Sequence, residues 1–533
     1  MVRLVLNMPQ MFATPPPLLT PLEGDGNVAN DSCEKARVTT ETHRFTKLEV
    51  LAMVCGCFFG IFPDQDIAKR VQPGQIPQKK KTGRRENDDD VIQFPYFTAV
   101  RMFSAPGNMK IIVLKAQKLR CMLQYFLRVI PRSISDGDAL SAEVIDFTRV
   151  GVHLPVAQGR TRGDQTSQEL LTILSSAVNN SDAASQDGAD THPQLCAARC
   201  VSDTLIEDLD KHLQIDFANK FAGGGVLNSG CVQEEIRFML SPELLVSCLL
   251  FAKLEPHEAF VIHGTERYSA YQGYGGSFVY GGNFDDTTEL VALPDGCQRR
   301  ECVIVGIDAT DYSSARMERQ YTRGHVWRDL VKAFAGFAYP TARDDKRCWP
   351  VATGNWGCGV FQGDRELKFL IQWLAASLSH RELVYVLFER DLDLQTKVDP
   401  FLTLATSQKA REWDQQCGGT TKWLSEFLFN ELCVGRGTRV EQSVLTRASL
   451  SLERALAMLQ MQNTATAPTQ KLQQPESPPQ VSPLSTESKQ KSSATPPPRE
   501  DQATDNSETP TKKPKTMKKE LQQRTMQDFF APK

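Results

Sequence analysis

The sequence contains no apolar stretch long enough to span a membrane. Its most apolar run, residues 48–62, is shorter than the roughly 20 residues that a membrane-spanning helix needs. We therefore expect this run to form a buried helix, and we expect no membrane among the partners. The first 19 residues also make a poor secretory signal, because their apolar run is broken and three prolines follow it.

Clustered metal ligands and an excess of one charge are also missing. The 8 histidines form no HxxxH or CxxH grouping, and neither close pair among the 14 cysteines has a zinc-ribbon partner. These patterns predict no metal site, and reduced, buried cysteines of the kind found in cytosolic and nuclear proteins. The 61 Lys and Arg residues nearly balance the 64 Asp and Glu residues, which excludes a uniformly basic nucleic-acid binder but not a local basic patch.

The length of 533 residues allows roughly two to four domains, and the hydrophobic content of 41% supports a sizeable core. Changes in composition divide the chain into six segments. We expect a disordered tail over residues 1–44, a mostly helical accessory domain over 45–170, a polar insert over 171–200, an α/β domain over 201–435, a short helix over 436–462 and a disordered tail over 463–533.

Short apolar runs alternate with helical patterns in the segment 201–435. Residues 259–263, 302–307 and 383–388 are continuously apolar and of strand length, which indicates strands covered on both faces. Residues 364–381 carry apolar side chains on one face, with acids in the first turn and basic residues in the last, as the helix dipole favours. This alternation predicts a layered α/β domain.

Three consecutive glycines, Gly223–Gly225, follow a predicted strand that ends near Asp216, and Gln233, Glu234 and Glu235 then enter a helical pattern. Consecutive glycines let the backbone approach a ligand closely, with N–H groups turned to phosphate. Adjacent residues on a helix point in different directions, so one glutamate should do chemistry while the other positions the substrate. The pattern indicates glycosidic or acyl chemistry on a phosphorylated ligand. The alternative is a flexible turn followed by a solvated helix face.

Two further loops fit such a ligand. Residues 353–364 (TGNWGCGVFQGD) place glycines ahead of a helix N-terminus, which favours anions. Residues 268–280 (YSAYQGYGGSFVY) place four tyrosines among three glycines, where a ring can lie over a planar base. A plain strand–helix turn and a Tyr-rich surface loop are the respective alternatives.

Together these motifs resemble the signature of the poly(ADP-ribose) glycohydrolase family: DFAN, GGG, QEE, the later GNWGCG loop and VYVLF. The resemblance covers roughly residues 48–429, apart from two polar inserts at 72–90 and 175–194. It implies an α/β macrodomain, in which a mixed sheet lies between helices, with an N-terminal α-helical accessory domain and disordered tails. It also implies hydrolysis of ribose–ribose O-glycosidic bonds in poly(ADP-ribose), releasing ADP-ribose, without a metal or diffusible cofactor.

The resemblance also implies residue roles. Glu235 becomes the general acid and then the general base, Glu234 holds the ribose being cleaved, and Asp216 belongs to the same catalytic motif. Among the substrate contacts, Asn219 meets the sugar, Glu207 and Gln233 read adenine or its ribose, Tyr274 stacks near the adenine, residues 355–360 cradle the diphosphate, and Phe388 packs against the distal ribose. The full set of implied substrate contacts is Ile206, Glu207, Asn219, Gly223, Gly224, Gly225, Gln233, Tyr274, Asn355, Trp356, Gly357, Cys358, Gly359, Val360, Phe361 and Phe388.

Three other functions are compatible with these motifs. The first is a non-catalytic macrodomain that binds ADP-ribose or its polymer, the second a glycosidase for another nucleotide sugar, and the third a scaffold with a vestigial pocket. The presence of both Glu234 and Glu235 favours the enzyme, because phosphate binding alone needs no carboxylate and is weakened by one.

The C-terminal segment carries a separate motif. Gln523, Met526, Phe529 and Phe530 have the spacing of a sliding-clamp binding box, with chance in a disordered tail as the alternative. The lysines within 512–519 suit an import signal, a nucleic-acid contact or simple solubilising charge. We expect a nuclear and also cytoplasmic monomer in the DNA damage response, acting on poly(ADP-ribose) carried by modified proteins, with a replication sliding clamp as a further partner.

Overall fold

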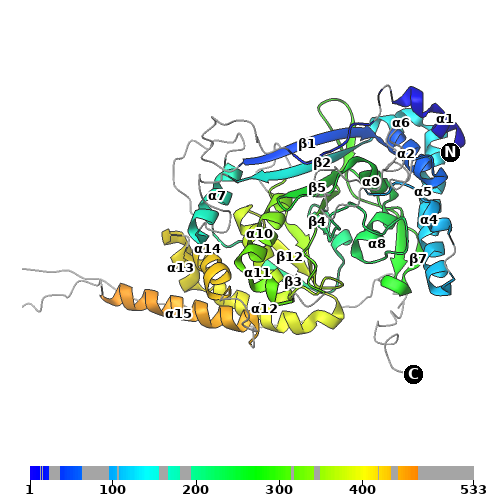
Figure 1. Cartoon of the computed structure of the whole chain (residues 1–533). Helices are drawn as coiled ribbons and strands as arrows, with labels where there is room; N and C mark the ends of the chain where they lie inside the picture. The colour runs from blue at the N-terminus through cyan, green and yellow to red at the C-terminus, as the bar shows by residue number, and fades with distance from the viewer. Residues whose placement is uncertain are drawn as a thin grey trace, which may run out of the picture. The chain divides into compact units, whose positions relative to one another are not determined.

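The computed structural model describes residues 1–12, 14, 16–22, 37–62, 95–104, 107–154, 166–179, 194–313, 317–340, 348–417, 419–433 and 442–465. Residues Met1–Met461 form one compact unit (Figure 1). The expected loop at 72–90 and the expected clamp-binding residues Gln523, Met526, Phe529 and Phe530 lie outside the described residues.

An eight-stranded mixed sheet runs through this unit, in the order β1-β2-β5-β10-β4-β11-β12-β3. The strands from β10 to β3 pair in parallel, whereas β1, β2, β5 and β10 pair antiparallel. The strands predicted near 259–263, 302–307 and 383–388 are confirmed. The bounds are β1 Arg37–Thr46, β2 Val144–His153, β3 Ala198–Val201, β4 Leu213–Asp216, β5 Glu258–His263, β10 Val303–Gly306, β11 Val351–Thr353 and β12 Leu383–Val386.

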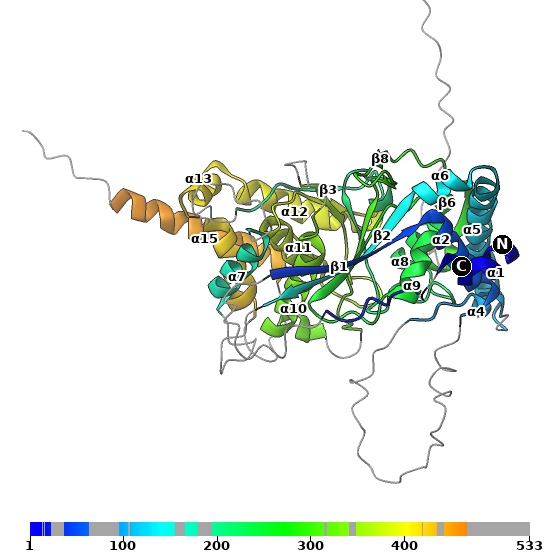
Figure 2. The ribbon, with the colours of Figure 1, turned by 90° about the horizontal axis from the view of Figure 1, so that it is seen from above.

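The two faces of the sheet carry separate hydrophobic cores. Val303 and Val305 of β10 belong to the core that the helices α10, α11 and α14 cover, whereas Ile304 belongs to the core of α2, α5 and α8. Burial on both faces explains why the central strands are continuously apolar rather than alternating. In Figure 2 the helices α1, α2, α4 and α5 gather at one end of the unit, away from α7 and α13.

The helices and short elements have these bounds: α1 Val2–Met11, α2 Lys47–Phe59, α4 Val100–Phe103, α5 Met109–Ser135, α6 Gly137–Ala142, α7 Ser167–Asn179, the 3-10 turn η2 Ile206–Asp208, α8 Gln233–Leu240, α9 Ser247–Leu250, α10 Arg323–Phe337, α11 Arg365–Leu378, α12 Leu392–Ala405, α13 Gln408–Cys417, α14 Gly419–Glu426 and α15 Val444–Ala465. Two small hairpins, β6 Ser269–Gln272 with β7 Val279–Asn283 and β8 Leu290–Ala292 with β9 Gln298–Arg300, lie outside the main sheet. No helix in this part is long and apolar enough to cross a bilayer.

The prediction of a disordered N-terminal tail over residues 1–44 was wrong for much of that range. Helix α1 occupies Val2–Met11, and β1 begins at Arg37 and pairs along all of its ten residues with β2. Only Phe45 of β1 is buried, because the strand lies at the sheet edge and backbone hydrogen bonds hold it there. Its polar composition therefore resembles that of a loop. Strand β2 likewise lies within the segment 45–170, which was expected to be mostly helical.

Two other segment boundaries also differ from the predicted ones. Helix α7 continues to Asn179, inside the expected polar insert, because Leu171 and Leu174 anchor it in the core, while Ser175 and Ser176 donate to carbonyls of the same helix. Residues 180–193 lie outside the described part, and β3 begins at Ala198, near the end of the expected insert. The short helix expected over 436–462 is α15, which begins later, at Val444, and is 22 residues long.

A buried charge cluster joins the helical elements to the sheet. Lys47, the first residue of α2, is 1% exposed, and its Nζ lies 2.9 Å from Glu266 Oε2, 3.2 Å from Glu143 Oε2 and 3.5 Å from Glu243 Oε1. Burial alone would raise the pKa of Glu266, but the field of Lys47 and of nearby arginines lowers that pKa to about 2. Lys47 is thus the cation that three buried carboxyl groups share.

Lys47→Met should lower the free energy of unfolding by about 3–5 kcal/mol, because Glu143 and Glu266 keep arginine partners, whereas Glu243 is left buried with no other ion pair among the described residues. Urea unfolding of the variant at neutral pH measures the loss. Lys110→Met, at an exposed position of α5, serves as the control and should change stability little. A similarly small loss for Lys47→Met would show that the cluster does not depend on this lysine.

Candidate functional site

A pocket of about 730 Å³ opens where the central parallel strands end. Phe217 follows β4, Gly354 follows β11 and Phe388 follows β12, and all three line the pocket. Ligands of open α/β sheets bind at this carboxyl edge. The pocket is therefore the candidate functional site.

Most of the residues predicted for the site line this pocket, although they come from five separate stretches of the chain. Asp216, Gly223 and Trp356 do not line it, because they lie buried behind its wall. The predicted residues that line it are Ile206, Glu207, Asn219, Gly224, Gly225, Gln233, Glu234, Glu235, Tyr274, Asn355, Gly357, Cys358, Gly359, Val360, Phe361 and Phe388.

The two glutamates lie in the first turn of α8, and backbone amides hold each of them. Glu234 accepts hydrogen bonds from the N–H groups of Gly223 (2.8 Å) and Asn219 (2.9 Å). Glu235 accepts them from Gly225 (2.9 Å) and Val232 (2.8 Å). The adjacent carboxyl groups are thus fixed in different orientations, as their positions on a helix predict.

The glycine loop was expected to turn its N–H groups to phosphate, and this expectation was wrong. The N–H groups of Gly223 and Gly225 are bonded to the two glutamates, and that of Gly224 to the carbonyl of Phe221 (3.0 Å). Glycine is needed for a different reason. A Cβ atom on Gly224, which has φ +50°, would lie 2.6 Å from Glu234 Oε2, so the absence of side chains lets the carboxylates approach the loop.

Burial makes two acidic groups of the site, Glu234 and Asp216, hold their protons tightly. The pKa of Glu234 is raised well above its ordinary value by burial, and then by the charges of Asp216 and Glu235. Burial, followed by the charge of Glu235, also raises the pKa of Asp216 well above its ordinary value. Neither oxygen of Asp216 has a hydrogen-bond partner among the described residues. The interior of the site thus favours the protonated forms of Glu234 and Asp216.

Aromatic side chains form the opposite wall. The Tyr274 hydroxyl accepts a hydrogen bond from the N–H of Gln233 (3.1 Å), and its ring lies 6.0 Å from that of Phe388, edge to face. The Tyr271 hydroxyl donates to Glu207 Oε1 (2.9 Å). Tyr271 lines the pocket and is missing from the predicted site, although the four-tyrosine pattern contains it.

The loop at 354–361 forms the third wall. Asn355 Nδ2 donates to Asp391 (2.9 Å), and the Tyr385 hydroxyl donates to Asn355 Oδ1 (3.2 Å), so this side chain is held by β12 and by the 3-10 turn Glu389–Asp391 that follows it. Trp356 is fully buried, with Lys368 Nζ lying 3.9 Å from the centroid of its ring. Trp356 therefore anchors the loop from below rather than contacting a ligand.

Lys118, in the middle of α5, supports the loop between the glycines and α8, and it was not predicted from the sequence. Its Nζ donates to the carbonyls of Asn228 (2.9 Å) and Gly230 (2.7 Å), and burial lowers its pKa to about 8. The neighbouring sequence does not distinguish a lysine with this role from any other lysine of an amphipathic helix. No group of three His, Cys, Asp or Glu side chains suited to a metal ion occurs in the described part of the chain.

Two family models match the sequence. The helical-domain model of poly (ADP-ribose) glycohydrolase (PARG) matches residues 1–149, and the macro-domain-fold model of the same family matches 185–395, which together is more than half of the chain. The chain belongs to the poly(ADP-ribose) glycohydrolase family. Its mixed sheet between helices is accordingly a macrodomain, and α1 and β1 fall within the match to the family's helical domain.

Curated relatives carry the same family name. The chain is 35% identical over 424 residues to "Poly(ADP-ribose) glycohydrolase 1" of Arabidopsis thaliana, covering 66% of each chain. It is 28% identical over 372 residues to "Probable poly(ADP-ribose) glycohydrolase 2" of the same plant, covering 62% of this chain and 60% of the relative. It is 37% identical over 192 residues to "Poly(ADP-ribose) glycohydrolase 1" of Caenorhabditis elegans, covering 34% of this chain and 24% of the relative. The chain thus spans just under two thirds of the plant relatives.

Asp216→Asn should make the stability of this family member less dependent on pH. The pKa of Asp216 is higher in the folded state than the unfolded value near 3.9, so its contribution to stability falls as the pH rises above about 4. Urea unfolding at pH 5 and pH 8 should show that the variant loses less stability between these values, by on the order of 1–3 kcal/mol. Asp138→Asn, on the exposed surface of α6, is the control. Equal pH dependence in wild type and Asp216→Asn would contradict this account.

Proposed function

We propose that the chain hydrolyses the ribose–ribose O-glycosidic bonds of poly(ADP-ribose) and releases ADP-ribose. The observation that carries this proposal is the pair Glu234 and Glu235, each fixed by two backbone amides and lining a pocket with aromatic and glycine-rich walls. Membership of the poly(ADP-ribose) glycohydrolase family supports the choice of polymer.

The reaction needs one carboxyl group that gives and then regains a proton. Glu235 in its acid form protonates the ribose oxygen that leaves, while the bond from this oxygen to the anomeric carbon breaks and the carbon becomes oxocarbenium-like. The Glu235 carboxylate then takes a proton from water, whose oxygen bonds to the anomeric carbon. The product is free ADP-ribose, and Glu235 is again protonated.

The other groups position the substrate. Glu234 holds hydroxyl groups of the ribose being cleaved, and Asn219 meets the same sugar. Tyr274 offers its ring to the adenine, beside Glu207, and the loop at 355–360 surrounds the diphosphate. Phe388, which is 40% exposed at the mouth of the pocket, packs against the distal ribose.

Glu235→Gln should lower the rate of ADP-ribose release by several orders of magnitude, because the amide cannot transfer the proton. Affinity for ADP-ribose should stay within about tenfold, since the pocket is kept. Chromatography of the products from purified polymer measures the rate, and calorimetry measures the affinity. Glu382→Gln, at an exposed position, is the matched control. Turnover close to the wild-type rate in Glu235→Gln would remove Glu235 from its role.

A macrodomain that binds ADP-ribose without cutting the polymer is the second candidate. The amide-fixed pair Glu234 and Glu235 favours the enzyme, because binding a diphosphate needs no carboxyl group, whereas cleavage needs one that transfers a proton. Binding of ADP-ribose together with no release of it from polymer by the wild-type chain would favour the second candidate.

We also propose a nuclear and cytoplasmic monomer in the DNA damage response, acting on polymer attached to modified proteins. Its C-terminal box, Gln523, Met526, Phe529 and Phe530, would bind a replication sliding clamp, and the preceding lysines would direct import. The support is the spacing of the box and the scarcity of aromatic residues elsewhere in the tail, since Phe529 and Phe530 are the only ones after Phe429. Short segments of this kind bind through a few apolar anchors.

Phe529→Ala combined with Phe530→Ala should eliminate clamp binding, because it removes two anchors of the box. Polymer hydrolysis and nuclear import should remain, since neither depends on these rings. Capture of the full chain by purified, immobilised clamp measures the first effect. Equal capture of the wild type and the double variant would show that the spacing is a coincidence.

A further inference from the structure

Two adjacent acids of the 3-10 turn η2 are both held by one neighbouring segment. The Glu207 carboxylate accepts from the Tyr271 hydroxyl (2.9 Å), and Asp208 Oδ1 accepts from Arg267 Nη1 (2.6 Å). Tyr271 lies within β6, and Arg267 lies two residues before this strand. The short turn is therefore held at two points by the tyrosine hairpin, which comprises β6 and β7 together with the two residues before β6.

Arg267 is held in one orientation by its surroundings. Its side chain is 8% exposed, its Nε donates to the Ser269 carbonyl (3.3 Å), and its guanidinium lies 3.9 Å from the ring centroid of Phe284. The backbone N–H of Arg267 donates to Asp286 (2.7 Å). A planar guanidinium with stacking and hydrogen-bond partners has little freedom to reorient.

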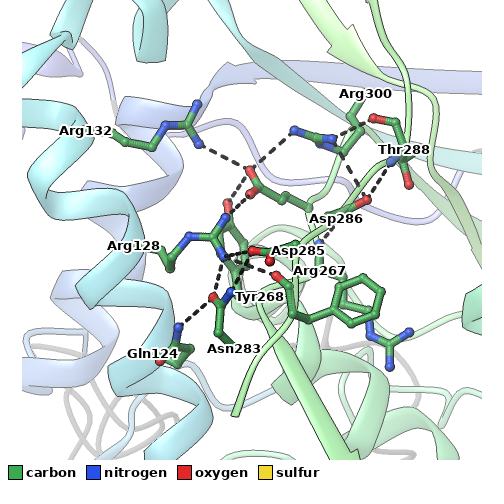
Figure 3. A network of polar contacts seen from close by, with 12 residues as sticks. Gln124, Arg128, Arg132, Arg267, Tyr268, Asn283, Asp285, Asp286, Thr288 and Arg300 are labelled. Carbon is green, nitrogen blue, oxygen red and sulfur yellow. Dashed lines mark hydrogen bonds and ion pairs between the residues drawn. The ribbon is translucent and has the colours of Figure 1, made fainter. Parts of the chain in front are cut away.

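The helical elements reinforce this arrangement from the other side. Figure 3 shows Gln124, Arg128 and Arg132 of α5 facing the segment that contains Asn283 and Asp286. Gln124 Nε2 and Arg128 Nη1 both donate to Asn283 Oδ1, at 2.9 Å and 2.5 Å. The segment that carries Arg267 is thus fixed before any ligand enters.

The orientation of the Glu207 carboxylate determines which purine base it can bind. Tyr271 occupies one carboxylate oxygen, so the second oxygen can accept a hydrogen bond from a ligand in the pocket that Glu207 lines. Adenine presents an exocyclic amine donor, whereas hypoxanthine has an oxygen acceptor at the same place. A fixed carboxylate therefore favours adenine, and a carboxylate that can turn away loses this selectivity.

We propose that Arg267 is a positioning residue for purine selection. Through Asp208 it fixes the turn that carries Glu207, and it thereby makes the pocket prefer ADP-ribose to inosine diphosphate ribose. This inference rests on the proposed function, which places the adenine beside Glu207.

Calorimetry with ADP-ribose and inosine diphosphate ribose tests the proposal on the full chain. The wild type should bind ADP-ribose at least about tenfold more tightly, the worth of one hydrogen bond to a charged group. Arg267→Gln and Asp208→Asn should each reduce this preference at least about threefold, because each weakens the binding of ADP-ribose and leaves that of inosine diphosphate ribose unchanged. The double variant should lose no more of the preference than either single variant does. Arg267→Lys should restore part of the preference, because it keeps a cation near Asp208.

Arg300→Gln is the matched control, since Arg300 belongs to the same network and pairs with Asp286 and Glu266 but makes no described contact with η2. It should keep the wild-type preference. The role of Arg267 would be overturned if Arg267→Gln and Asp208→Asn kept the wild-type preference. It would also be overturned if they lost affinity for both nucleotides equally. If Arg267→Gln fails to fold, Asp208→Asn decides the question, because its side chain is 40% exposed. Failure of the wild type to bind either nucleotide would overturn the proposed function as well.

Discussion

The site depends on one constraint: two adjacent carboxyl groups must lie in a buried wall, and each must still receive hydrogen bonds. Four backbone amides meet this need, two for Glu234 and two for Glu235. Burial, followed by the charges of Asp216 and Glu235, raises the pKa of Glu234 against the opposing effect of its two amide donors. The glycines follow from the same constraint, because side chains at Gly224 or Gly230 would occupy the space of the carboxylates.

A loop made of glycines has little packing of its own, so other elements must support it. Helix α5 does this at both ends of the pocket. Lys118 holds the carbonyls of the loop between the glycines and α8, while Gln124 and Arg128 hold the tyrosine hairpin. The buried cluster around Lys47 secures the helical elements in turn. The helical domain therefore supports the site, although none of its described residues lines the pocket.

The arrangement has a cost in stability. Asp216 is fully buried, and neither of its oxygens has a partner among the described residues, and burial also raises the pKa of Glu234. Such groups weaken a fold as the pH rises, because the unfolded chain ionises them more readily. The surrounding core is accordingly extensive, with apolar layers on both faces of the sheet. Local violations of good packing chemistry, compensated elsewhere, are typical of functional sites.

The sequence by itself determined the central strands, the long helices and most of the pocket residues, because apolar periodicity and the glycine and glutamate motifs are local patterns. The edge strand β1 escaped prediction, since backbone pairing with β2 holds it and its side chains are mostly polar. Only the tertiary structure decided where the glycine N–H groups point, that Trp356 lies beneath its loop, and that Lys118 and Arg267 support the site. These relations join residues far apart in the chain, and no short pattern records which donor meets which acceptor.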